Sequence, residues 1–145
     1  MSGSASGGTQ KYGGGAIYNH YGISISGNLH AAKVYVHEFG HLFLGLGDEY
    51  VEVGSSYNDM YPTNVEPWEA NLTTLTNFNK KWKDMLDKDT PVPTTYDPQN
   101  PKKLGAYEGG GYVSKGVYRP RYDCLMNTLS GKDFCQFGLS VIGCQ

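Results

Sequence analysis

The segment from Asn28 to Leu44, NLHAAKVYVHEFGHLFL, constrains the fold of this chain more than any other. It contains no proline, it offers Ser26 or Asn28 as an N-cap, and Gly45 follows it as a residue well suited to end a helix. The segment is therefore predicted to be an α-helix. Its apolar residues are too numerous for one face, so both sides of the helix are expected to be covered, as in a central helix of a domain.

Two histidines and a glutamate in this helix have the spacing of a zinc site. His37 and His41 are four residues apart, so their imidazoles lie one helical turn apart and can bind one metal. Zinc suits imidazole nitrogen, and a catalytic zinc has three protein ligands and an open position. Glu38 follows the first histidine, which predicts a general base rather than a ligand. Zinc then activates a water and polarises the scissile carbonyl, and Glu38 passes the proton to the leaving amine.

A third protein ligand is required, and the residues after the helix offer two carboxylates. If the helix ends at Gly45, the chain can turn back so that Asp48 or Glu49 reaches the metal. Asp48 is the predicted ligand, although an ordinary surface acid would fit the same position. Glu49 is expected to orient a neighbour or to bind backbone. In a competing arrangement, a glutamate from a later helix is the third ligand, and Glu66 or Glu69 would serve.

The rest of the chain is expected to contain few regular elements. Residues 10–19 and 21–26 are short, β-branched and aromatic, which predicts one or two strands near the site. Residues 104–127 are rich in glycine, tyrosine and arginine and have no helical period. A second helix is predicted over residues 71–87, where apolar residues recur at intervals of three, four or seven: Leu72, Leu75, Trp82, Met85 and Leu86.

Length and charge narrow the class of protein. A chain of 145 residues is long enough for one domain, which we place at residues 10–145, after a flexible tail or linker at residues 1–9. Twelve Lys and Arg nearly balance fourteen Asp and Glu without a basic block, so nucleic acid is not an expected partner. No apolar run approaches the roughly 20 residues that span a bilayer, and residues 1–8 lack the features of a signal peptide.

The stretch HEFGHLFLGLGDEY resembles the motif of the metzincin zinc peptidases, H-E-x-x-H-x-x-G-x-x-H or D followed by a methionine-containing turn. Three residues, Leu42 to Leu44, precede the glycine where metzincins usually have two, and this longer form is similar to that of the igalysins, the IgA peptidase family. The resemblance extends to NLT, KKWKDML, AYEGGGY, GVYRPRYDCLMN and FC. It implies an α+β, metzincin-like domain with a central HExxH helix, a reduced N-terminal sheet and a loop-rich C-terminal part.

The resemblance also implies roles for individual residues. His37, His41 and Asp48 would bind Zn²⁺, Glu38 would be the general base, and Met126 would be the methionine of the turn beneath the metal. As a core residue, Met126 would pack in nearly the same way.

Residues around this methionine carry two further implications. Cys124 and Cys135 match the paired cysteines of the family, which implies a disulfide. Four residues can hydrogen-bond an oxyanion or bind a substrate carboxylate, and they suit a solvated surface equally well: Tyr118, Arg119, Arg121 and Tyr122.

The function implied is a zinc endopeptidase that acts on a protein or peptide, secreted or held at the surface of a bacterium. Only 36 residues precede His37, where metzincins have a multi-stranded sheet and a helix, so the chain is a fragment or has a minimal N-terminal part. One alternative is a zinc-stabilised binding module or inactive fragment, and another is an amidase that uses the same chemistry. The presence of Glu38 favours an enzyme, because structural zinc sites need no base and usually have four protein ligands. The sequence does not indicate an oligomeric state.

Overall fold

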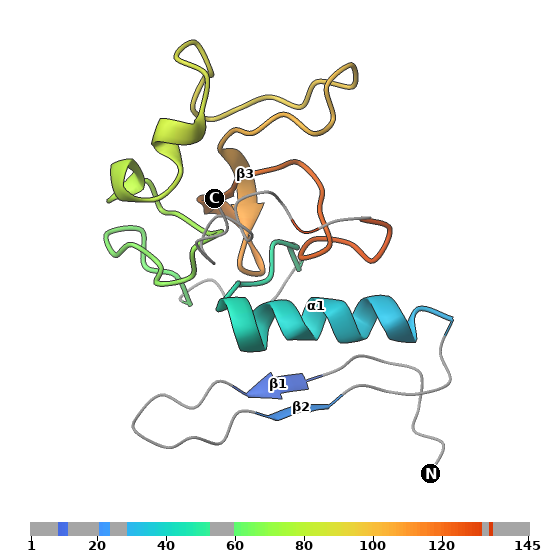
Figure 1. Cartoon of the computed structure of the whole chain (residues 1–145). Coiled ribbons are helices and arrows are strands. Elements are labelled where there is room, and N and C mark those ends of the chain that lie inside the picture. The colour runs from blue at the N-terminus through green and yellow to red at the C-terminus, as the bar shows by residue number, and fades with distance from the viewer. Residues whose placement is uncertain (1–8, 12–20, 24–28, 53–59, 132–133, 135–145) are drawn as a thin grey trace.

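The fold is α+β, with one long helix between two small antiparallel sheets (Figure 1). The computed structural model describes residues 9–11, 21–23, 29–52, 60–131 and 134. The helix α1 (Ala31–Leu44) has β1 (Thr9–Lys11) and β2 (Tyr21–Ile23) against one side and the remaining described residues on the other. The two strands overlap the predicted ones, and Thr9, which we assigned to the tail, is the first residue of β1. Within the described residues, no helix combines the length and apolar character needed to cross a bilayer.

The helix α1 begins slightly later than predicted. His30 is at the N-cap without a side-chain cap bond, and its carbonyl accepts a hydrogen bond from the N–H of Val34 at 2.9 Å. The predicted caps, Ser26 and Asn28, lie outside the described residues. At the other end the prediction is confirmed, because Gly45 is left-handed with a φ of 62°. This C-cap reverses the chain and directs the next residues back towards the helix.

The covering of α1 is incomplete. Tyr35, Phe39 and Phe43 form a stripe at intervals of four residues whose exposed fractions are 61%, 39% and 67%. Phe39 and Phe43 stack on each other with ring centroids 5.0 Å apart. The prediction that both sides are covered therefore agrees with the placement of α1 between two layers, but it is wrong for this exposed stripe.

The predicted helix over residues 71–87 is wrong. The structure has only two 3₁₀ turns there, η2 (Phe78–Lys80) and η3 (Lys83–Met85). Thr73 instead forms a β-bridge with Tyr118, and its hydroxyl accepts a hydrogen bond from the N–H of Leu75, whose φ is 66°. Polar side chains that bond to backbone in this way compete with helix formation. The apolar residues do recur at helical intervals, but the backbone of the segment bonds to Tyr118 and to the Thr73 hydroxyl instead of forming a helix.

A hairpin occupies part of the stretch that we expected to be irregular. Strands β3 (Tyr107–Gly110) and β4 (Val113–Arg119) pair antiparallel, with a register shift between Glu108 and Gly110. The hairpin packs beside the segment that follows α1, since Val51 forms a β-bridge with Tyr112 at its turn. The glycines of this stretch therefore build a tight turn rather than a loop.

The main core lies against the C-terminal end of α1, where Leu44 packs on it. Trp82 is fully buried, its indole N–H donates to the carbonyl of Gly105 at 2.9 Å, and its ring meets Phe78 edge to face. The second tryptophan, Trp68, is 63% exposed and lies over Gly45, where an added Cβ would be 3.1 Å from its ring. The buried members of this core come from four separate segments of the chain: Leu46, Phe78, Trp82, Ala106, Cys124 and Met126.

A lysine fixes the loop between the helix and the 3₁₀ turns. Lys81 Nζ donates to the carbonyl oxygens of Pro67 at 2.5 Å and Glu69 at 2.8 Å, and also to that of Leu72. The carboxylate of Glu66 is 3.2 Å from the same nitrogen. One ammonium group thus contacts four oxygen atoms and stabilises a loop that has no regular secondary structure.

Candidate metal centre

His37 and His41 lie one turn apart on α1 with their rings edge to face, and their Nε2 atoms are 3.2 Å apart. The other ring nitrogen of each histidine faces a backbone carbonyl: His37 Nδ1 is 2.9 Å from Leu125 O, and His41 Nδ1 is 2.6 Å from Leu46 O. Because a carbonyl only accepts hydrogen bonds, the hydrogen of each neutral imidazole is assigned to Nδ1. Each Nε2 is then left with a lone pair that can bind a cation.

Asp48 completes the group. After the turn at Gly45, the chain returns past the helix end and brings Asp48 Oδ1 to 3.0 Å from His37 Nε2 and 3.2 Å from His41 Nε2. Oδ2 of the same carboxylate accepts a hydrogen bond from the hydroxyl of Tyr112. Burial alone would raise the pKa of Asp48, but the adjacent His37 and His41 and the hydrogen bond from Tyr112 hold it well below its usual value. The carboxylate is therefore charged.

The three ligand atoms fit a divalent cation. Asp48 Oδ1 is buried and has no hydrogen-bond partner of good geometry within the described part of the chain. Two lone-pair nitrogens and one charged oxygen face each other at 3.0–3.2 Å, which favours a positive charge between them. Zinc bonds of about 2.0–2.1 Å at tetrahedral angles separate neighbouring ligand atoms by about 3.3 Å. Burial lowers the pKa of His41, but Asp48 outweighs burial and raises it, so protons compete for the same site.

The other acids that we weighed as third ligands are engaged elsewhere. Glu49 is fully buried and accepts hydrogen bonds from Asn71 Nδ2 at 2.9 Å and from the Cys124 thiol at 3.1 Å. Burial and the nearby Cys124 raise its pKa well above the usual value. Glu66 pairs with Lys81, as described above. Glu69 accepts a hydrogen bond from Tyr61. Of the four candidates, only Asp48 joins the two histidines in a group that could hold a metal.

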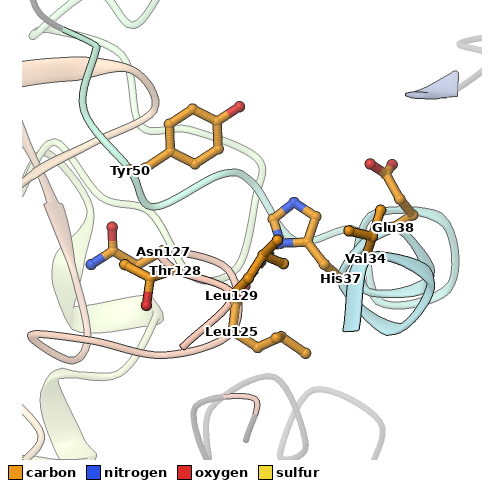
Figure 2. Close-up of a pocket in the computed structure, with 8 residues that line it drawn as sticks. All are labelled: Val34, His37, Glu38, Tyr50, Leu125, Asn127, Thr128 and Leu129. Carbon is orange, nitrogen blue, oxygen red and sulfur yellow. Dashed lines mark hydrogen bonds between the residues drawn. The ribbon is translucent and has the colours of Figure 1, made fainter. Parts of the chain in front are cut away.

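Glu38 lies beside this group without joining it. Its side chain is buried, and burial raises its pKa, while attraction to His41 and His37 opposes the rise. Together with His37, it lines a cavity of about 260 Å³ whose opposite wall includes Tyr50 and Asn127 (Figure 2). The apolar lining consists of Val34, Leu125 and Leu129. A carboxylate with a raised pKa at the edge of such a cavity can both take up and release a proton.

A comparison with known families identifies the family of this chain. The family model described as IgA Peptidase M64 matches residues 7–100 and 96–143. The chain belongs to this family. Membership assigns it to the peptidases and thus implies a protein or peptide substrate, and it confirms the family that we inferred from the sequence. No curated protein matches the chain.

The methionine that the IgA peptidase resemblance singles out is fully buried next to the helix. An added Cβ on Gly40 would be 2.9 Å from Met126 Sδ, so the absence of a side chain lets the two segments meet. The carbonyl of Met126 accepts a hydrogen bond from the N–H of Glu49 at 2.8 Å. Since Leu125 O contacts His37, the segment supports both the helix and the Asp48 loop. The role of Met126 as a Met-turn residue stays a prediction.

Three of the four aromatic and basic candidates of the IgA peptidase motif, all except Arg121, have structural partners among the described residues. Arg119 donates to the carbonyls of Glu108 and Gly109 on one side and to that of Tyr122 on the other. Tyr122 stacks on Tyr96 with centroids 3.9 Å apart, and Tyr118 packs against the core. Their substrate contacts stay predictions.

The predicted disulfide cannot be traced in the described residues. Cys124 is buried, and its thiol donates to Glu49. Its predicted partner, Cys135, lies outside the described residues. The pairing therefore stays a prediction.

Sequence reasoning missed three residues that build this centre. Tyr112 contacts the Asp48 carboxylate, Tyr50 lines the cavity, and Asn71 exchanges hydrogen bonds with the backbone N–H and carbonyl of Gly47, both at 2.8 Å. The run EGGGY offered one signal, because consecutive glycines mark a turn that can approach other backbone closely. No comparable signal marked Asn71, whose partners lie 22 or more residues away.

Proposed function

We propose that this peptidase is a zinc-dependent endopeptidase in which Glu38 is the general base. The observation that carries the proposal is the convergence of His37 Nε2, His41 Nε2 and Asp48 Oδ1 within 3.2 Å of one another, beside a buried glutamate at the edge of a cavity. Three protein ligands are the number typical of a catalytic zinc, whereas structural zinc usually has four.

Different residues bind the metal and transfer the proton in this proposal. A bound zinc ion supplies Lewis acidity, which lowers the pKa of a water molecule to about 7 and polarises a carbonyl. His37, His41 and Asp48 would hold this ion. The Glu38 carboxylate accepts a proton from the attacking water and returns it to the leaving amine.

The cavity beside Glu38 supplies a place for the substrate. Its apolar lining suits an apolar side chain, whereas Asn127 and Thr128 provide amide and hydroxyl groups for the substrate backbone. Because the cavity adjoins both Glu38 and His37, a peptide bound there would have its scissile bond near the metal group (Figure 2).

The first test measures zinc per chain after dialysis against metal-free buffer, for the parent, Asp48→Ala and Asp84→Ala. Asp84 is an exposed acid in η3 and serves as the matched control. We expect about one zinc in the parent and in Asp84→Ala, and far less in Asp48→Ala. A parent without zinc would refute the proposal, and zinc retained by Asp48→Ala would refute the ligand assignment.

The second test compares the parent with Glu38→Gln on a library of peptides and on simple non-peptide amides. Glu38→Gln keeps the shape of the side chain but removes the base, so we expect peptide cleavage to fall by about 10²–10⁴-fold while zinc stays bound. Bound zinc without hydrolysis by the parent would favour a binding module, and hydrolysis of simple amides alone would favour an amidase.

A further inference from the structure

The third ligand, Asp48, has a close neighbour with an unusual backbone conformation. Tyr112 has a φ of 70° at the turn of the β3–β4 hairpin, directly after Gly111 with a φ of 58°. The left-handed region is natural for glycine but uncommon for a bulky residue such as tyrosine, and such residues concentrate at functional sites. A glycine would adopt this conformation more easily, so the presence of tyrosine at this position suggests that its side chain has a function.

Backbone hydrogen bonds hold the turn in this conformation. Gly111 N–H donates to the carbonyl of Asp48 at 2.8 Å, and Tyr112 N–H donates to that of Tyr50 at 2.9 Å. Glu52 N–H donates to the carbonyl of Tyr112 at 3.0 Å. The hairpin turn is therefore aligned along the metal-binding segment, and its position is fixed relative to Asp48 before any side chain is considered.

The hydroxyl of Tyr112 donates to Oδ2 of Asp48, while Oδ1 of the same carboxylate faces the two imidazoles. A carboxylate can bind a metal through one oxygen or through both, and it can rotate between these modes. A hydrogen bond to one oxygen ties that oxygen to the donor and leaves the other for the metal. The ring of Tyr112 is in turn set edge to face against Tyr50, with centroids 5.0 Å apart.

We propose that Tyr112 is a positioning residue that orients Asp48 so that only Oδ1 binds the metal. The proposal rests on the zinc site proposed above and adds the residue that selects the ligand atom. Tyr112 acts through Asp48, so its loss changes how tightly and in what geometry the metal is bound.

The experiment removes the hydroxyl and measures metal binding in the absence of substrate. Zinc affinity is measured by competition with a chromophoric chelator, and the visible absorption of the Co²⁺-loaded protein reports the coordination geometry. The variant is Tyr112→Phe, which keeps the ring. The matched control is Tyr107→Phe on β3 of the same hairpin, because the hydroxyl of Tyr107 donates to the carbonyl of Lys103 at 3.1 Å, outside the metal group.

We expect Tyr112→Phe to bind zinc about 10–100-fold more weakly than the parent, as is typical when a partner of a metal ligand is lost. Its Co²⁺ spectrum should also change, whereas Tyr107→Phe should match the parent in both respects. Parental affinity in Tyr112→Phe, or an equal loss in Tyr107→Phe, overturns the proposal and leaves the zinc site standing. A parent that binds neither metal refutes the site itself, and the positioning role with it.

A second variant decides the question if Tyr112→Phe does not fold. Tyr112→Gly removes the hydroxyl and also relieves the left-handed backbone, so it should fold more readily. Weak metal binding by folded Tyr112→Gly supports the role of the hydroxyl, and parental binding overturns it.

Discussion

The two halves of the candidate metal centre are built by different physical means. His37 and His41 reach it from a regular helix, where spacing alone places them one turn apart. Asp48 reaches it from an irregular segment that is held by buried and half-buried polar groups from distant parts of the chain. Tyr112 is 64 residues from Asp48, and Cys124 is 75 residues from Glu49. The helical half therefore depends on local structure, whereas the loop half depends on tertiary hydrogen bonds, and substitutions should affect the two unequally.

The largest expected effect on stability is in the loop half, at Asn71. Asn71→Leu keeps the branching of the side chain but leaves the N–H and carbonyl of Gly47 and one oxygen of Glu49 buried without this partner. Each of the three buried groups that loses its partner costs about 1–3 kcal/mol, so we expect a total cost of at least about 3 kcal/mol. Urea unfolding at fixed zinc concentration measures the loss. The control is Asn79→Leu at an exposed position of η2, and a cost no larger than that of the control would contradict the comparison.

A smaller effect, which depends on pH, is expected at Glu66. Burial opposes ionisation of Glu66, but its hydrogen bonds, including that from Asn77 N–H, and the ammonium of Lys81 lower its pKa below 4.5. A carboxyl group whose pKa is lowered by folding stabilises the protein at pH values above its pKa in the unfolded chain. This contribution is lost as the pH falls through the pKa of the group in the folded protein. Glu66→Gln should therefore cost about 1 kcal/mol at pH 7, and the difference from the parent should shrink below about pH 4.5. A difference that stays constant down to pH 3 would show that charge is not the cause.

The smallest effect is expected on the exposed stripe of α1. Phe43 is 67% exposed, so Phe43→Ser should change stability by only about 0.5 kcal/mol, mainly through the lost stacking on Phe39. Leu46→Ala, three residues further along and almost fully buried, should cost about 2–4 kcal/mol. Thermal unfolding of the two variants compares them directly. A large loss in Phe43→Ser would mean that the stripe is covered in the protein.

The same division explains which features the sequence predicts. The helix and its end are local properties: an uninterrupted apolar segment, a glycine that accepts φ above zero, and two histidines at a fixed spacing. The chain reversal at Gly45 made Asp48 the predicted third ligand, and the structure brings it to the two imidazoles. Such features need no knowledge of the rest of the chain.

The loop half was harder to predict because its polar residues have several possible partners. Asn71 and Thr73 were interpreted as the start of a helix, yet their side chains bond to Gly47, Glu49 and Leu75. Apolar periodicity cannot reveal these bonds. Tyr112 was missed for a related reason, since a positive φ at tyrosine depends on backbone bonds supplied by another segment.

The unequal burial of the two tryptophans gives the protein a pair of optical reporters. Trp68, exposed and lying over the end of α1, should emit at longer wavelength and be quenched readily by acrylamide. Trp82 is shielded in the core and bonded to Gly105, so its emission should be blue-shifted and resist the quencher until the core opens. Fluorescence from one unlabelled sample can therefore follow the helix end and the loop core separately and reveal which of them loosens first.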